Sequence, residues 1–229
     1  MTFKDETAFE AALINLLTDK YGWEPEILRY KTEEDLIQNW KQILFENNRD
    51  IDRLNDVPLT DGEMQQILDQ ITKLRIPLKL NGFINGKTVA IMRDNPADTL
   101  HFGKEVSLKI YDQREIAAGQ SRYQIAQQPV FKARSAVLPN RRGDFMLLIN
   151  GMPLIHCELK RSGVDVSQAY NQIEKYAHEG VFSGLFSLVQ IFIAMQPDET
   201  VYFANPGPEG VFNKDFYFHW ADANNEPLN

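Results

Sequence analysis

Residues 143–160 read Gly-Asp-Phe-Met-Leu-Leu-Ile-Asn-Gly-Met-Pro-Leu-Ile-His-Cys-Glu-Leu-Lys, with Asp144 near the start and Glu158 and Lys160 at the end. Two apolar runs flank Asn150-Gly151. This dipeptide favours the type I′ turn of a β-hairpin, because both central residues of that turn have positive φ. The stretch therefore predicts two antiparallel strands joined by a tight turn.

The predicted hairpin places an aspartate, a glutamate and a lysine at the end that is far from the turn. Residues two apart on a strand share a face, so Glu158 and Lys160 project together while Cys157 and Leu159 point to the opposite, buried side. Asp144 begins the partner strand at the same end. A carboxylate pair suits a divalent cation with oxygen ligands, which activates water and neutralises phosphate charge, and an ammonium group can orient the water.

A surface ion pair is the structural alternative for these charged residues. Charged side chains at the end of an apolar strand cost free energy, however, unless they are paired or exposed at a site. The pattern as a whole therefore favours a catalytic site. His156 lies on the same predicted face and is interpreted as a hydrogen-bonded structural histidine rather than as a ligand or a base.

On these residues the chain resembles the PD-(D/E)xK nucleases, and more narrowly the N-terminal nuclease domain of the motor (R) subunits of type I restriction enzymes. That family has Asp, an apolar run, Asn-Gly, a proline and a final Glu-apolar-Lys, which residues 144–160 match almost position for position. Its Gln-x-x-x-Tyr element has a counterpart in Gln172 and Tyr176. The resemblance covers roughly residues 7–220 and is weak between 26 and 123.

The resemblance implies an α/β fold of the restriction-endonuclease type, with a mixed central sheet flanked by helices and a helical N-terminal portion. It implies a Mg²⁺-dependent DNA endonuclease in which Mn²⁺ can substitute. Asp144 and Glu158 would hold the metal, and Lys160 would position or activate water. Glu10 of the first helix would face the metal; Glu6, one turn away, is its competitor, and a solvent-facing Glu10 is the structural alternative.

The Gln-x-x-x-Tyr element is expected to serve the same site. Gln172 and Tyr176 are four apart and share one helix face. They would contact the DNA backbone or support the metal ligands. The structural alternative is a helix that Tyr176 packs, with Gln172 exposed.

The family also implies a larger assembly. ATP would be used only by the full-length subunit, whose ATP-driven motor follows this segment. The expected partners are double-stranded DNA and the methylation and specificity subunits of a type I complex. Two other functions stay open: a free-standing nuclease of repair or defence, and a non-catalytic DNA-binding or assembly module of the same fold.

Composition is that of an ordinary globular protein. The 229 residues are 43% hydrophobic and 24% charged, which allows one domain with a sizeable core, or two small ones. A single cysteine excludes a disulfide within the chain and a cysteine metal cluster, and suits a reducing cytoplasm. No signal peptide or membrane span is expected, and the longest apolar stretch, residues 181–195, is interpreted as core strand.

The net charge of −8 argues against strong autonomous DNA binding, because neutralisation of phosphates dominates such affinity. Positive residues nevertheless gather around the proposed site. Arg141, Arg142 and Arg161 are expected to form a DNA-facing rim, joined by Lys132, Arg134 and Lys160. For Lys132 and Arg134, a solvated strand edge is an equal alternative.

The chain is predicted to have three parts: a helical portion over 1–78 that supplies the first nuclease helix, a β-rich elaboration and nuclease core over 79–220, and a linker toward an absent motor domain over 221–229. Helices are expected over 5–20, around 36–44, over 60–74 and over 166–177. Short β segments are expected from 78 to 111, and strands over 123–126, 130–136, 144–149, 154–160, 188–194, 201–203 and 211–220. Residues 82–88 resemble a phosphate-binding loop but are one residue too short, and a hairpin turn is preferred.

Overall fold

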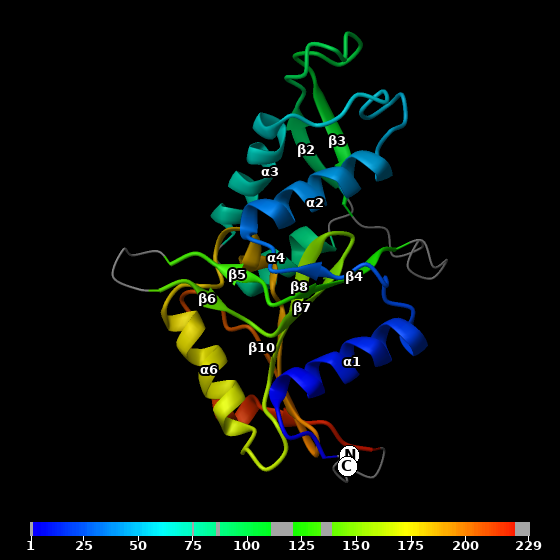
Figure 1. The fold of residues 1–229 in the computed structure, drawn as a ribbon. Coiled ribbons are helices and arrows are strands. Elements are labelled where there is room, and N and C mark those ends of the chain that lie inside the picture. The colour runs from blue at the N-terminus through cyan, green and yellow to red at the C-terminus, as the bar shows by residue number, and fades with distance from the viewer. Residues whose placement is uncertain (1, 75, 86–87, 111–120, 134–138, 223–229) are drawn as a thin grey trace.

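The computed structural model describes residues 2–74, 76–85, 88–110, 121–133 and 139–222 (Figure 1). Its centre is a seven-stranded mixed sheet in the order β1-β4-β7-β8-β9-β10-β11. The strands are β1 (Leu28–Arg29), β4 (Tyr123–Gln127), β7 (Phe145–Ile149), β8 (Met152–Leu159), β9 (Ile191–Gln196), β10 (Glu199–Ala204) and β11 (Phe218–His219). Two short sheets pair β2 (Thr88–Met92) with β3 (Glu105–Lys109) and β5 (Val130–Phe131) with β6 (Arg141–Arg142).

Helices cover both faces of the central sheet. They are α1 (Glu6–Tyr21), α2 (Glu33–Asn47), α3 (Asp61–Lys73), α4 (Pro77–Ile84) and α6 (Ser167–His178), with 3₁₀ turns η1 (Gly184–Leu188) and η2 (Lys214–Phe216). Figure 1 shows α1 and α6 on opposite sides of the strands, with α2, α3 and the β2–β3 pair stacked beyond one end of the sheet. The expected α/β architecture, a mixed sheet flanked by helices, is confirmed.

Two apolar cores follow from strand alternation in β7. Phe145 and Leu147 pack toward α1 in the smaller core, whereas Met146 and Leu148 belong to the larger core, which also contains residues of α2, α3, α4 and α6. Because both faces are covered, β7 reads as an uninterrupted apolar run. None of the helices within the described residues combines the length and apolar character that crossing a bilayer requires.

The predicted β7–β8 hairpin is confirmed. Asn150 and Gly151 both have positive φ, 51° and 83°, as a type I′ turn requires. The strands pair from Ile149↔Met152 at the turn to Phe145↔Cys157 at the far end. A Cβ on Gly151 would lie 2.9 Å from the Cα of Trp40, so the turn also needs glycine in order to pack against α2.

The helical N-terminal portion is held by caps and by a buried ion-pair network. Thr60 forms a capping box with Glu63 at the start of α3. The Glu63 carboxylate also accepts from the guanidinium of Arg93 at 2.6 Å, and Arg93 contacts Asp98 at 3.0 Å. All three side chains are fully buried, so this network ties α3 to the segment that follows β2.

Three expectations were wrong in detail, and two short strands were not expected. Residues 78–84 belong to α4, because Pro77 occupies the first helical turn and Leu80 and Ile84 share a buried face. Residues 184–188 form η1, so the strand expected from 188 begins at 191. Of the expected strand over 211–220, only residues 218–219 form a strand, β11, which pairs with β10. The two-residue strands β1 and β6 were missed because they are too short to show periodicity.

Candidate active site

The far end of the β7–β8 hairpin carries the predicted carboxylates. Asp144 precedes β7, and its Oδ2 accepts a hydrogen bond from the backbone N–H of Leu159 at 2.6 Å. Glu158 lies near the end of β8 and is fully buried, with its carboxyl group next to that of Asp144. Cys157 and Leu159 point into the smaller core, as alternation predicts. The hairpin therefore brings the two carboxyl groups together.

Glu158 is held from both sides. The imidazole Nε2 of His156 lies 3.0 Å from Oε1. The amide Nε2 of Gln172 donates to Oε2 at 2.8 Å, so α6 reaches the carboxyl group. The same amide nitrogen lies 2.8 Å from the hydroxyl of Tyr176, which donates to the carbonyl of Arg142 at 3.0 Å. The Gln-x-x-x-Tyr element thus connects Glu158 to the segment that leads into Asp144.

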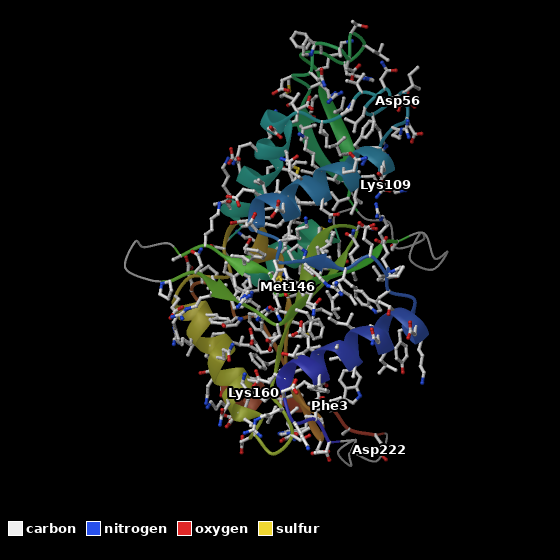
Figure 2. All side chains as sticks on the ribbon, in the orientation of Figure 1. Phe3, Asp56, Lys109, Met146, Lys160 and Asp222 are labelled. Atoms are coloured by element: carbon white, nitrogen blue, oxygen red, sulfur yellow. The ribbon has the colours of Figure 1, made fainter. Side chains whose placement is uncertain are left out.

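Lys160 completes the cluster from the C-terminal end of β8. Its Nζ donates to the carbonyl of Leu159 at 2.9 Å and to Oε1 of Gln172 at 3.1 Å. Figure 2 shows Lys160 close to Phe3 at the start of the chain. Two hydrogen bonds join Phe3 to Ser162, and they bring the beginning of α1 beside this strand end.

The first helix contributes two glutamates with different surroundings. Glu10 is 3% exposed, so the solvent-facing alternative is wrong. Its carboxylate accepts from the amides of Gln127 at 2.7 Å and Gln128 at 3.3 Å. The backbone N–H of Gln128 donates to the carbonyl of Asp144, so Gln128 links Glu10 to that aspartate by hydrogen bonds. Glu6 instead lies 3.6 Å from the Nζ of Lys160.

The oxygen ligands at this site fit a small hard cation, although they are few. Among the described residues no three His, Cys, Asp or Glu side chains form a metal-binding group. Asp144 and Glu158, with the carbonyl of Leu159, supply oxygen ligands of the kind that Mg²⁺ takes, and this ion usually keeps several waters. Two carboxyl groups buried side by side also favour a bound cation, because the cation would stabilise their ionised forms.

Comparison with known proteins gives this geometry a context. A family model described as the type I restriction enzyme R protein N terminus matches residues 3–211. The SsaAORF53P endonuclease subunit of Staphylococcus saprophyticus, a type I restriction enzyme, is 33% identical over 233 residues, covering 100% of this chain and 22% of that subunit. The chain belongs to the R protein N-terminal family.

Two further relatives are also type I restriction enzyme endonuclease subunits. The SauMSSORF170P endonuclease subunit of Staphylococcus aureus is 32% identical over 231 residues, again covering 100% of this chain and 22% of the relative. The EcoprrI endonuclease subunit of Escherichia coli is 38% identical over 86 residues, which cover 37% of this chain and 28% of the relative. The chain thus spans 22% of the length of the staphylococcal subunits that it matches.

In this R protein chain the expected basic rim is partly neutralised. Arg141 is engaged by both carboxylate oxygens of Glu179 at 2.7 Å, and Lys132 pairs with Glu34 at 2.7 Å. Arg142 and Arg161 are exposed. Arg134 lies outside the described residues. The positive charge that faces solvent beside the cluster is therefore smaller than the sequence suggests.

The carboxyl groups of Asp144 and Glu158 have pKa values far above their ordinary ones. Burial, and secondarily the charge of Glu158, raises the pKa of Asp144 to about 8. Burial likewise raises the pKa of Glu158 to about 8, against the opposing effects of its hydrogen bond to Asp144 and of Lys160. Because two carboxyl groups buried this close together resist being ionised at the same time, they retain a shared proton and titrate as a pair. Burial lowers the pKa of the neighbouring His156 to about 4.

The metal-free R protein chain should lose stability as the pH rises from about 5 to about 8. A group whose folded pKa is raised contributes stability that is complete below its unfolded pKa, here 3.8 for Asp144 and 4.5 for Glu158, and that is lost through the folded value of about 8. His156, with a lowered pKa, acts in the opposite direction below its ordinary value of 6.5. We expect a loss of at least about 1.4 kcal/mol, the equivalent of one pKa unit.

Thermal unfolding in chelator, measured across this pH range, tests the expectation. A loss of that size lowers Tm by roughly 3–6 °C for a chain of this length. The Asp144→Asn, Glu158→Gln double variant keeps the shape of the pair but cannot titrate, so it should lack this component. Parallel Tm curves for the wild type and the double variant would contradict the shared-proton pair.

Proposed function

We propose that this chain is a Mg²⁺-dependent endonuclease region of a type I restriction enzyme R subunit, with a PD-(D/E)xK active site. The observation that carries the proposal is the buried carboxyl pair of Asp144 and Glu158, with Lys160 at the end of the same strand. The printed names of its relatives, type I restriction enzyme endonuclease subunits, support the same activity class.

Each side chain then has a distinct task. Asp144 and Glu158 hold Mg²⁺, or Mn²⁺ in its place, with the Leu159 carbonyl as a further oxygen ligand. When bound, the cation supplies charge neutralisation at the phosphate and lowers the pKa of water. Lys160 orients the attacking water or stabilises negative charge on the phosphate. Gln172 fixes the side chains of Glu158 and Lys160 relative to each other, because it hydrogen-bonds to both.

The longer subunit supplies the rest of the activity in this proposal. Regions beyond the part matched here, about four-fifths of the staphylococcal relatives, would carry the ATP-driven motor. Methylation and specificity subunits would complete the complex in the cytoplasm. Double-stranded DNA would be delivered to the carboxylates by those parts, which raise its effective concentration at this site.

Residues 1–229 alone should therefore bind duplex DNA weakly and without sequence preference. The chain carries −8 overall, and Arg141 is already paired with Glu179. Few phosphate contacts give a Kd of about 10⁻⁴–10⁻⁶ M at physiological salt, and the affinity should fall as salt is added with a shallow slope that reflects the small number of contacts. Gel-shift titration over a salt series measures both properties.

The same reactions with Mn²⁺ test the nuclease itself. Cleavage should be slow or absent, and any cleavage should disappear in Glu158→Gln. Cleavage that persists in Glu158→Gln would overturn the assignment of this site. Tight, sequence-selective binding with rapid cutting by the wild-type chain would instead favour a free-standing nuclease.

A further inference from the structure

The imidazole of His156 lies in an enclosure that prevents it from turning away from Glu158. The ring is fully buried and is surrounded by aromatic side chains from separate parts of the fold. The ring-centroid distances are 5.2 Å to Phe182, 5.9 Å to Phe131, 6.3 Å to Phe192 and 6.5 Å to Tyr176. Its Nε2 edge is directed at the carboxyl group of Glu158, 3.0 Å from Oε1.

Gly143 closes the remaining side of this enclosure. A Cβ at that position would lie 2.5 Å from Cε1 of His156, 3.1 Å from the ring of Phe131 and 3.4 Å from Oε1 of Glu158. The backbone that leads directly into Asp144 therefore rests on the imidazole. One ring thus touches both the chain before the first carboxylate and the side chain of the second.

Hydrogen bonding favours one tautomer of this ring. An imidazole enclosed by aromatic rings is costly to charge, and the neutral ring has one donor and one acceptor. Within the described part of the chain, Nδ1 of His156 has no hydrogen-bond partner. A proton on Nδ1 would leave a buried donor unpaired, which costs more than an unpaired acceptor. A proton on Nε2 lets the ring donate to Glu158.

We infer that His156 is a positioning residue that fixes the carboxyl group of Glu158 for metal binding. Its Nε2–H donates a hydrogen bond to Oε1, while the amide of Gln172 donates one to Oε2 at 2.8 Å. Two donors, one on each oxygen, set the plane of the carboxyl group, and its remaining lone pairs stay available on the side of Asp144. The inference rests on the proposed metal site, and it assigns His156 neither ligation nor proton transfer.

The tautomer is tested on the wild-type chain without metal. Long-range ¹H–¹⁵N correlation spectra of ¹⁵N-histidine-labelled protein distinguish Nε2–H from Nδ1–H, and the signals of His156 are those that disappear in His156→Gln. We expect the Nε2–H form. An Nδ1–H form would overturn the inference, because the ring would then accept a proton from Glu158 instead of donating to it.

Metal affinity tests the consequence. His156→Leu removes the donor at similar volume, whereas His156→Gln keeps an amide nitrogen that can reach the position of Nε2. Calorimetry with Mn²⁺ should show affinity about 10–100-fold weaker for His156→Leu, the usual effect of losing a partner of a metal ligand, and within a few-fold of wild type for His156→Gln. A matched Tm for the two variants shows that both fold.

The outcomes separate the two proposals. Wild-type affinity in His156→Leu, or equal losses in the leucine and glutamine variants, would overturn the role of His156 and leave the metal site standing. Absence of Mn²⁺ binding by the wild-type chain would overturn the proposed metal site and this inference together. If His156→Leu does not fold, the tautomer and the His156→Gln titration still decide the matter.

Discussion

Lys160→Ala should abolish DNA cleavage by the longer subunit in its complex while ATP hydrolysis and translocation persist. The ammonium group lies at the end of β8, 2.9 Å from the Leu159 carbonyl oxygen and 3.1 Å from Oε1 of Gln172, and its charge lowers the pKa of both carboxyl groups. Removing a group that stabilises transition-state charge typically costs a factor of about 10²–10³ in rate. The motor, in our proposal, lies outside this chain and should be unaffected.

Cleavage of circular plasmid and ATP hydrolysis are measured in the same reactions. Lys104→Ala is a matched control, because Lys104 is an exposed lysine just before β3, in the region that stacks beyond the end of the sheet (Figure 1). It should cut DNA at the wild-type rate. Loss of both cleavage and ATP hydrolysis in Lys160→Ala would instead indicate a structural role for this lysine.

The metal should behave differently in the same variant. Lys160 is a cation close to the proposed ligands, so its removal should leave Mn²⁺ affinity unchanged or slightly raised. This result would distinguish the lysine from the carboxylates, because loss of a carboxylate should abolish metal binding. Weaker Mn²⁺ binding in Lys160→Ala would show that the ammonium group is needed to hold the carboxyl pair in place.

The hairpin that carries the site could be predicted because local rules determine it. Asn150-Gly151 selects the turn, and alternation along β8 assigns Glu158 and Cys157 to opposite faces. The one-residue shift in pairing between Leu147 and Leu148, which brings Phe145 opposite Cys157, was not predicted. The Gln172–Tyr176 spacing likewise specifies one helix face. These features depend on neighbours within about 15 residues.

Features built from distant segments could not be predicted in this way. The enclosure of His156 joins Phe131, Phe182 and Phe192, which come from three parts of the chain. Nothing local indicates that Glu179 neutralises Arg141. Gly143 was a visible signal, since a glycine directly before a predicted metal ligand suggests a close approach. Its contact with His156 required the folded structure.

Asp144→Ala should remove metal binding altogether, because a two-carboxylate site that loses one carboxylate keeps too few charged ligands for a hard cation. The fold should survive. Losing the acceptor for the Leu159 N–H costs about 1–3 kcal/mol, which relief of repulsion with Glu158 partly offsets. Asp144→Asn is the sharper variant, because its amide oxygen can still accept from Leu159 while the charge is gone.

Calorimetric titration of Mn²⁺ into the wild-type chain, Asp144→Ala and Asp144→Asn is the most direct test of the metal site. At pH 8 or above, protons compete least with the metal ion for the two carboxyl groups, and the wild type should show weak, saturable binding of one ion. Neither variant should bind, although both unfold cooperatively. Binding of Mn²⁺ by the variants with wild-type affinity would contradict the assignment of Asp144 and Glu158 as joint metal ligands.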